Sequence, residues 1–381
     1  MSTDPEYVDS LRKFLSNESP PEVARRQDQL KLPPLELLRE FANLGYLTAG
    51  LPSEWGGFGT FVDATRIMEE VAKSNLALGH LAGRSVYGVQ ALLQFGTDQQ
   101  KQRWIPPLSE GTTVFSIALT EPDSGSDAAS IRTRAAKDGD DWIIDGEKIF
   151  ASSFEYAGVS MVSVRTNPDD HGRGGISTFL VEPSSPGISC ERLETLGDWA
   201  IGTYRVFFDN VRISSENLLG DLHQGWKVIG GHLARERIIM SARAIGATQS
   251  LLDETAQYVC NRRQFGKALG DHQAVQHKLA DIQLELQVAR SALYDIAREE
   301  SEGGVKFAAA AAVKVFASEM YLRAANSCLQ VTGGFGYTTD FSAERHLRDA
   351  RVYVIGGGSS EVMRNIIARE LLREPRAQAE R

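Results

Sequence analysis

VQHKLADIQLELQVARSALYDI, residues 275–296, carries a helical pattern over its whole length. Its apolar side chains recur at alternating steps of four and three, at Val275, Leu279, Ile282, Leu286, Ala289, Leu293 and Ile296. This spacing gathers them into one stripe along an α-helix, which is typical of a helical bundle. A second long, alanine-rich helix is predicted from Phe307 to Leu329. The C-terminal part of the chain is therefore predicted to be a bundle.

Upstream of the bundle, short β-type runs replace the helical period. They lie between about residues 112 and 220 and read VFSIAL, DWIIDGEKIF, VSMVSVR, ISTFLVE and YRVFFDNVRI. Asp145 and Gly146, between two apolar runs, are predicted to form a tight turn. The first hundred or so residues show helical spacing again, interrupted by the loop GLPSEWGGFG at 50–59. We therefore expect an α+β fold with an N-terminal helical domain at 1–112, a middle β-barrel or sandwich domain at 113–222 and a C-terminal bundle domain at 223–381.

Composition excludes several classes of protein. The net charge is −9, with acidic and basic residues interleaved, which argues against nucleic acid or an anionic membrane as the main partner. The three cysteines, Cys190, Cys260 and Cys328, form no CxxC and favour a reducing compartment. The first residues contain no apolar leader, and the chain has no run of 18 uncharged apolar residues. We expect a cytoplasmic protein that does not enter a membrane.

The motifs of several common sites are absent from the sequence. There is no GxGxxG after a strand, no GxxxxGK[ST], no HExxH and no GxSxG. These absences argue against a Rossmann site, a P-loop, a zinc site and a hydrolase nucleophile, and we expect no metal.

Three glycine-containing stretches are candidate ligand sites. TEPDSGSD, at 120–127, could bring backbone N–H groups and hydroxyls against a phosphate or a flat ring, although an ordinary strand-to-loop turn explains it equally well. In NRRQFG, at 261–266, Arg262 could bind a pyrophosphate, but a solvated arginine is the default. QVTGGFGY, at 330–337, is explained by a helix that ends in glycine.

The combination of motifs resembles the acyl-CoA dehydrogenase family. The matching stretches follow the family order: GLPSEWGGFG, TEPDSGSD, DGEKIFAS, FFDNVRISSENLLG, NRRQFGKALGDHQ, QVTGGFGY, RDAR, IGGGSSEVMR and IIAREL. The resemblance implies helical, β and helical domains, a non-covalent FAD, and a homodimer or homotetramer that shares each flavin site across an interface. It agrees with the architecture expected from periodicity.

The resemblance also implies a set of cofactor and substrate residues. In the β-domain, the flavin would be held by Thr120, Ser126, Phe150 and Ser152. Where Phe150 stands, family members usually have an aromatic residue, often Trp. The residues that would reach the FAD of a neighbouring subunit are Arg262, Phe265, Gln273, Gln330 and Gly334. Ser359 and Glu361 match positions near the cofactor, where other members often have Thr and Gln. The substrate is expected to contact Ser126, Arg237 and Gly358.

The stretch IGGGSSEVMR, at 355–364, lacks the usual catalytic base. Many family members read Tyr-Glu-Gly-Thr here, and that glutamate removes the α-proton; this chain has Gly356 and Gly357 in place of Tyr and Glu. Isovaleryl- and long-chain-type members take the carboxylate from a C-terminal helix, and in HLARERII, at 232–239, the matching residue is Glu236. Glu236 also lies on the apolar stripe of its own helix, where a carboxylate costs desolvation free energy unless it is paired or used. The alternative is a structural ion pair with Arg235 or Arg237.

The expected reaction is α,β-dehydrogenation of an acyl-CoA thioester. Glu236 would take the α-proton, and the backbone N–H of Gly357 would bind the thioester carbonyl together with a ribityl hydroxyl of FAD. The β-hydride would pass to flavin N5. Three alternatives stay open: the same chemistry on an acyl carrier protein, reduction of an enoyl or crotonobetainyl-like thioester, and a non-catalytic flavin-binding scaffold. An electron-transfer flavoprotein is a possible acceptor.

Overall fold

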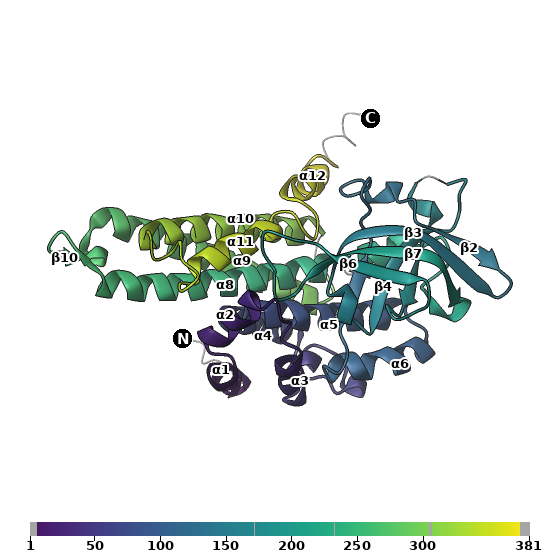
Figure 1. Ribbon diagram of the computed structural model, residues 1–381, viewed down its shortest axis with the longest axis horizontal. Coiled ribbons are helices and arrows are strands. Elements are labelled where there is room, and N and C mark those ends of the chain that lie inside the picture. Colours follow the sequence, from purple (N-terminus) through teal and green to yellow (C-terminus); the bar gives the residue numbers. More distant parts are fainter. Residues whose placement is uncertain (1–5, 171, 232, 305–306, 374–381) are drawn as a thin grey trace.

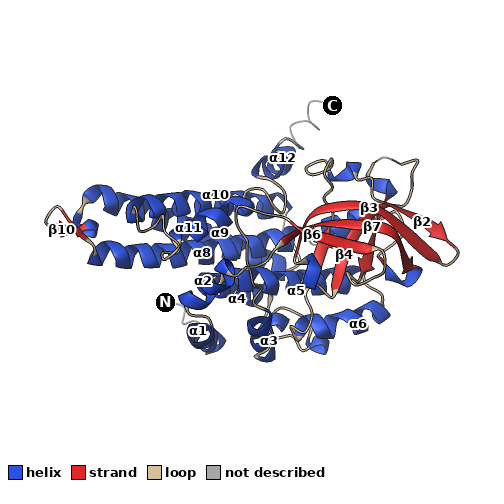
Figure 2. Cartoon of the chain, in the orientation of Figure 1, coloured by secondary structure: helices blue, strands red, loops and turns tan. Residues whose placement is uncertain are grey.

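The computed structural model describes residues 6–373 except 171, 232, 305 and 306. An N-terminal group of helices, a middle sheet and a C-terminal group of helices follow one another (Figure 2). The sheet lies at one end of the long axis, and the tip of a helical hairpin lies at the other (Figure 1). The order of helical, β and helical regions expected from the sequence is confirmed, although the expected outer domains extend into residues 1–5 and 374–381, outside the described residues.

The N-terminal helices are α1 (Glu6–Glu18), α2 (Pro21–Gln29), α3 (Leu35–Asn43), α4 (Phe61–Ser74), α5 (Leu76–Phe95) and α6 (Asp98–Ser109). Asn75 separates α4 from α5. Its backbone N–H donates to the carbonyl of Val71 at 2.7 Å, and its side-chain oxygen accepts the N–H of Leu78 at 3.0 Å. A single asparagine thus ends one helix and caps the next, which allows α5 to leave α4 at an angle and run beside the site described below.

The middle region forms one mixed sheet of eight strands. The strands are β1 (Phe115–Ala118), β2 (Arg134–Asp138), β3 (Asp141–Ser152), β4 (Val159–Arg165), β5 (Ile176–Val181), β6 (Ile188–Arg192), β7 (Thr203–Ser214) and β8 (Leu218–Leu219). Their order is β6-β7-β3-β2-β4-β5-β8, and β1 pairs with β4 in parallel. Every residue of β4 and β5 is buried, whereas burial alternates along most of β3 and β7. The sheet is therefore covered on both faces at β4 and β5 and keeps one accessible face at β3 and β7.

The predicted turn at Asp145 and Gly146 is wrong. Strand β3 continues through both residues, and its register with β7 shifts between Ile144 and Gly146. Gly146 has a φ of +144°, and a Cβ there would lie 2.7 Å from Thr133 on the neighbouring segment. The glycine forms a β-bulge inside a long strand, since an Asp-Gly pair suits a bulge as well as a hairpin turn.

The C-terminal helices are α7 (Gly225–Gly231), α8 (Leu233–Asn261), α9 (Gln273–Ser301), α10 (Phe307–Thr332), α11 (Ala343–Tyr353) and α12 (Ser360–Leu371). A hairpin of β9 (Arg263–Gln264) and β10 (Lys267–Ala268) joins α8 to α9. In α9 the predicted stripe is buried from Ile282 to Ile296, while Val275 and Leu279 are half-buried where the bundle thins towards this hairpin. None of the described helices is long and apolar enough to cross a membrane.

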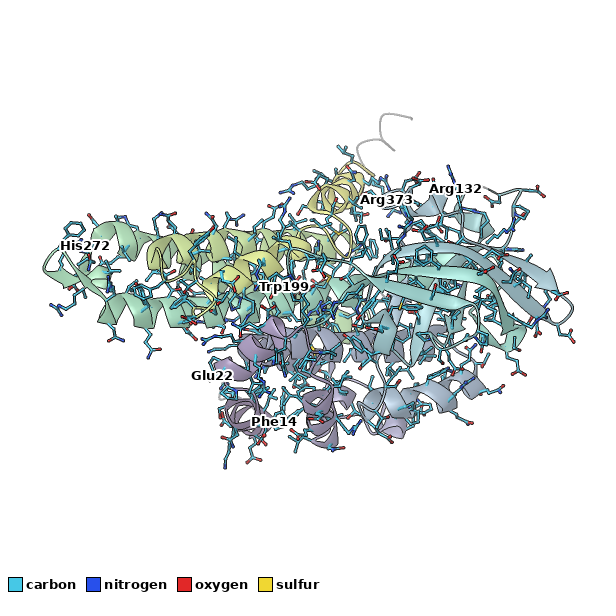
Figure 3. The ribbon with its side chains drawn as sticks, in the orientation of Figure 1. Phe14, Glu22, Arg132, Trp199, His272 and Arg373 are labelled. Carbon is cyan, nitrogen blue, oxygen red and sulfur yellow. The ribbon has the colours of Figure 1, made fainter. Side chains whose placement is uncertain are left out.

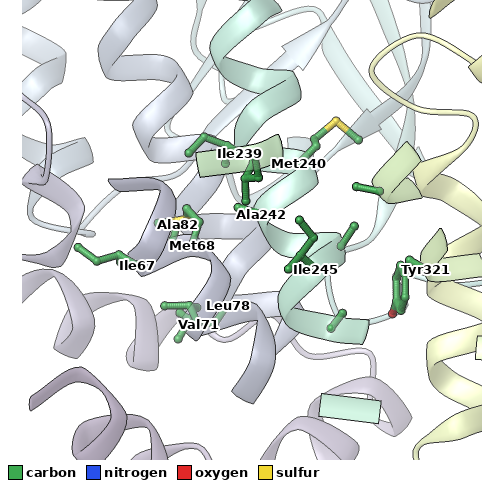
Figure 4. Close-up of a cluster of buried hydrophobic side chains, with 14 of the residues drawn as sticks. Ile67, Met68, Val71, Leu78, Ala82, Ile239, Met240, Ala242, Ile245 and Tyr321 are labelled. Atoms are coloured by element: carbon green, nitrogen blue, oxygen red, sulfur yellow. The ribbon is translucent and has the colours of Figure 1, made fainter. Parts of the chain in front are cut away.

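One apolar core joins the two helical regions. Ile67, Met68 and Val71 of α4 pack with Ile239 and Ile245 of α8 (Figure 4). Helices α4 and α8 approach closely at Gly246, where any side chain would meet the backbone of α4. This shared core sets the position of α8 relative to α4 and α5, and α8 carries the predicted base.

A junction of all three regions contains two buried carboxyl groups. Trp199 lies between the sheet and the helices (Figure 3), and the guanidinium of Arg348 stacks 3.8 Å from the centre of its ring. Asp198, which precedes Trp199, donates its backbone N–H to the Asp349 side chain at 2.8 Å. Burial, and next the negative charge of Asp198, raises the pKa of Asp349 to about 8. The folded protein therefore keeps a proton that the unfolded chain loses near pH 4.

Asp349→Asn is expected to change how stability depends on pH. Because the folded-state pKa is raised, wild-type stability falls as pH rises between about 4 and 8. Asparagine keeps the acceptor for the Asp198 N–H and has no proton to lose. As the pH rises, the free energy of unfolding of the variant should therefore increase relative to wild type by up to about 1.4 kcal/mol per pH unit. Unfolding free energies measured at pH 5, 6, 7 and 8 test this. The exposed control Asp340→Asn should leave the pH slope unchanged; an unchanged slope in Asp349→Asn would contradict the prediction.

Candidate active site

The glycine loop between α11 and α12 packs against α8. Gly357 has a left-handed φ of +65°, which favours glycine. A Cβ added there would lie 2.7 Å from the Sδ of Met240. Met240 follows Glu236 by one turn of α8, so the two share a face of the helix. The structure thus brings together the two residues predicted to be catalytic, Glu236 and Gly357.

Lys314 of α10 fixes this loop. Its ammonium donates to the carbonyl of Gly358 at 2.8 Å, and its side chain is 1% exposed. Burial, and next the charge of Arg237, lowers the pKa of Lys314 to about 8. Within the described residues the backbone N–H of Gly357 has no hydrogen-bond acceptor. Lys314 thus fixes the loop at the Gly358 carbonyl, while the neighbouring Gly357 N–H is left available to a ligand.

Glu236 is half-buried in the first turn of α8. Arg235 forms an ion pair with Glu300 of α9, and Arg237 stacks 4.1 Å from the ring centre of Phe307. In the part of the chain that the structure describes, Glu236 forms no ion pair. The structure therefore shows neither of the ion pairs considered as an alternative role for this carboxylate.

Several cations nevertheless lie within electrostatic reach of Glu236. Burial lowers the pKa of Arg84 on α5, and the negative charge of Glu236 is the main effect that raises it. Burial lowers the pKa of Arg237 to about 10, again opposed by Glu236. The charge of Glu236 also raises the pKa of Lys314, against the effect of burial. The carboxylate is held in a positive environment without direct contact.

The predicted flavin residues of the β-domain cluster at the ends of β1 and β3. The carbonyl of Thr120 accepts the N–H of Ile149 at 2.9 Å, and the carbonyl of Ser152 accepts the hydroxyl of Ser116 at 2.8 Å. Phe150, between them, has a φ of +59° where the β3–β7 register shifts, and it is 60% exposed. Ser126 is exposed on the loop that follows β1. All four residues thus lie at or next to the ends of β1 and β3, and this end of the sheet is named the sheet edge.

A buried ion pair supports this edge. Glu121 accepts the backbone N–H groups of Arg132 and Thr133 at 2.6 and 2.8 Å and the ammonium of Lys148 at 2.7 Å. Lys148 also donates to the carbonyl of Leu119 at 2.9 Å. Burial raises the pKa of Glu121, but the charge and hydrogen bond of Lys148 outweigh that effect, so the pKa is lowered overall. The pair ties the 120–127 loop to β3.

The second group of predicted FAD residues lies at the far tip of the bundle. Arg262 follows α8 and its guanidinium lies 5.4 Å from the ring centre of Phe335, while Phe265 is 94% exposed in the β9–β10 turn. His272 marks this tip in Figure 3 and β10 marks it in Figure 1, opposite the sheet. Exposed residues of the same tip are Gln273, Gln330 and Gly334. One chain does not bring them to the sheet, and a flavin shared between subunits stays a prediction.

Ser359 and Glu361 lie at the start of α12. The hydroxyl of Ser359 caps the helix by accepting the N–H of Val362 at 3.3 Å. Glu361 is exposed, and backbone and Ser359 hydrogen bonds lower its pKa. Its position keeps it out of the buried space beside Glu236.

The residues at the sheet edge fit a flavin. The exposed ring of Phe150 offers a flat apolar surface beside the hydroxyl-bearing Thr120 and Ser152. At Gly125 no atom lies within 4 Å of the place a Cβ would take, so a ligand can approach the backbone there.

Four polar residues of this site were not predicted from the sequence. They are Arg84, Lys148, Arg243 and Lys314, all on predicted strands or helices. A signal was present for Arg243 and Lys314. Arg243 follows Glu236 by seven residues on the same helical stripe, and Lys314 interrupts an alanine-rich run at core spacing.

Comparison with known proteins assigns the family. Models of the acyl-CoA dehydrogenase N-terminal, middle and C-terminal domains match residues 3–112, 116–211 and 223–372. A probable acyl-CoA dehydrogenase of Bacillus subtilis (strain 168) is 35% identical over 367 residues, which are 95% of this chain and 96% of the relative.

Solved structures agree with this assignment. Butyryl-CoA dehydrogenase from Megasphaera elsdenii superposes with a TM-score of 0.92 at 29% identity, covering 98% of this chain and 100% of that one. A glutaryl-CoA dehydrogenase from Mycobacterium smegmatis, in complex with FADH2, gives 0.89 at 28% identity, with coverage of 96% and 93%. The chain belongs to the acyl-CoA dehydrogenase family and is an FAD-dependent oxidoreductase.

Proposed function

We propose that the protein catalyses α,β-dehydrogenation of an acyl-CoA thioester with Glu236 as the base. The observation that carries the proposal is the contact between Gly357 and Met240, one turn from Glu236. The contact supports the proposal because Glu236, half-buried and without an ion pair among the described residues, precedes Met240 by one turn, and because the Gly357 N–H is unoccupied there. Glu361, the carboxylate next in sequence to the loop, is exposed.

The residues divide the work of removing the α-proton. The Gly357 N–H donates to the thioester carbonyl, which stabilises the negative charge that develops on its oxygen. Glu236 accepts the proton from the α-carbon as a general base. Lys314 holds the Gly358 carbonyl, so the loop is already in place when the substrate arrives. FAD, which Thr120, Phe150 and Ser152 would hold at the sheet, would supply the acceptor for the β-hydride, so that the product would be a 2-enoyl thioester.

Substrate-dependent loss of flavin colour tests this function. The protein, purified with FAD, is mixed without oxygen with saturated acyl-CoA thioesters and with the same acyl groups on an acyl carrier protein. We expect acyl-CoA thioesters to bleach the flavin. Bleaching by carrier-bound acyl groups alone would show that the substrate is attached to an acyl carrier protein and not to CoA. If only enoyl thioesters react, by reoxidising chemically reduced flavin, the protein works as a reductase. No reaction with any thioester would refute the proposed reaction.

The assembly and the electron acceptor stay predictions. The distance between the sheet edge and the bundle tip supports a homodimer or homotetramer with a shared flavin site. An electron-transfer flavoprotein is the acceptor we propose.

A further inference from the structure

Two arginines reach the same space beside Glu236. Arg84 lies on α5, and its Nε donates to the Nε2 of His80 at 3.4 Å. Arg243 lies on α8, and its Nη1 would be 3.7 Å from a Cβ added at Gly83, the residue before Arg84. Burial lowers the pKa of His80, and the charges of Arg243 and Arg84 lower it further. Both guanidinium groups therefore act on one neutral imidazole.

Among the described residues, neither guanidinium has an anionic partner in direct contact. Arg243 is 7% exposed, and its Nε finds no hydrogen-bond partner in the described part of the chain. Its guanidinium lies 5.6 Å from the ring centre of Tyr353, whose hydroxyl is also buried without a partner among those residues. In the described part of the chain, no carboxylate oxygen lies within 4 Å of Arg84 or Arg243. A buried cation without a counter-ion costs several kcal/mol, so the arrangement lacks an anion.

Two carboxylates act on the arginines at longer range without contacting them, since the charges of Glu236 and Asp198 both oppose the effect of burial on the pKa of Arg84. Asp198 lies 3.9 Å from the Nδ1 of His80 and does not contact either arginine. Glu236 loses its charge in the proposed reaction when it accepts the α-proton. Arg237 and Lys314 add two further cations around Glu236. Positive charge therefore exceeds negative charge around Glu236 once this residue has accepted the α-proton.

Arg243 lies further along the face of α8 that carries Glu236. Glu236, Met240 and Arg243 follow one another on that face at steps of four and three. Arg243 is about 10 Å along the helix from Glu236. On the α5 side, α5 packs closely against α8 because Gly83 has no side chain, and a Cβ there would lie 3.4 Å from Ile239. An acyl chain whose α-carbon lies at Glu236 would have to pass Met240, which is 8% exposed, to reach the arginines.

We propose that the acyl group of the substrate ends in a carboxylate bound between Arg84 and Arg243, so that the substrate is the thioester of a dicarboxylic acid. The inference rests on the proposed function. A guanidinium binds a carboxylate through two parallel hydrogen bonds, which would use the free donors of Arg243. An alkyl end would leave both cations unpaired, and the ammonium group of an aminoacyl thioester would be repelled by them.

Paired thioesters of equal length test this specificity. Wild-type protein with bound FAD is mixed without oxygen with succinyl-, glutaryl- and adipyl-CoA and with butanoyl-, pentanoyl- and hexanoyl-CoA. We expect the best diacid thioester to reduce the flavin in a single turnover with a second-order rate constant about 10- to 100-fold above that of its alkyl partner, as for one charge-assisted contact. Equal or faster reduction by alkyl thioesters would overturn the diacid proposal and leave the dehydrogenase function standing. No reduction by any thioester would overturn both.

Variants separate charge recognition from general damage. Arg243→Met and Arg84→Met should each lose about 10- to 100-fold in diacid affinity and keep or gain affinity for alkyl thioesters. Binding is measured by calorimetry in the Glu236→Gln background, where turnover does not interfere. Arg298→Met, an exposed arginine of α9, is the matched control and should match the background variant. An equal loss for diacid and alkyl thioesters in the Arg243 and Arg84 variants would show a structural role and refute the proposal.

Discussion

Glu236→Gln is expected to slow single-turnover flavin reduction by about 10²–10⁴-fold. Glutamine has nearly the same size and keeps some hydrogen bonding, but it cannot accept the α-proton. The fold should tolerate the change, since Glu236 is half-buried and forms no ion pair within the described residues. The variant should still bind FAD and the thioester, seen as a spectral shift on ligand addition without bleaching. Rapid mixing without oxygen, followed at the flavin absorption band, gives the rate.

Glu361→Gln is the matched control for that experiment. Glu361 belongs to the glycine stretch itself, but it is exposed at the start of α12. If Glu361 contacts the cofactor as the resemblance implies, its replacement lowers flavin occupancy, but the reduction rate per bound flavin should stay close to that of wild type. A rate for Glu236→Gln within a few-fold of wild type would remove Glu236 from the role of base. A large loss of reduction rate in Glu361→Gln alone would assign the role of base to Glu361.

The helices and their order could be predicted because periodicity survives in the sequence. A helix that buries one stripe must repeat apolar residues at steps of three and four, and α9 does so from Ile282 to Ile296. The position of Glu236 on such a stripe could be read in the same way. Its proximity to Gly357 could not, because the contact depends on how α8 and a loop more than a hundred residues later pack together.

The features that sequence analysis missed are those decided by tertiary contacts. Asp145 and Gly146 have the composition of a tight turn, but pairing of β3 with β7 draws them into one strand with a bulge. The ion pair of Arg235, and the Nε of Arg243 that stays unpaired among the described residues, depend on how α8 packs with α9, α5 and α11, which no local pattern reveals. The burial of Lys148 could not be predicted either, because lysine is rarely buried without a partner and its partner is not evident from the sequence.

Lys148→Met is expected to destabilise the folded protein by about 3–5 kcal/mol, because it leaves Glu121 buried without its cation. Lys148 is 0% and Glu121 7% exposed. Methionine fills a similar volume, so the loss reports the charge more than the packing. The 120–127 loop should shift as well, and FAD retained per chain after gel filtration should fall. Chemical denaturation gives the free energy of unfolding, and flavin absorbance gives the occupancy.

The pH dependence of this loss distinguishes the ion pair from simple packing. The wild-type pKa of Glu121 is lowered overall, so the stability that its charge contributes is present above the ordinary range of a glutamate, about pH 4, and is lost as pH falls through the lowered folded-state pKa. Without Lys148 the carboxyl group can protonate at higher pH, which relieves the unpaired charge. The difference between wild type and Lys148→Met should therefore narrow as the pH is lowered from 7 towards 4. Lys137→Met, at an exposed position of β2, should show a small difference at every pH. A difference as large at pH 4 as at pH 7 would assign the loss to packing of the lysine side chain and not to its charge.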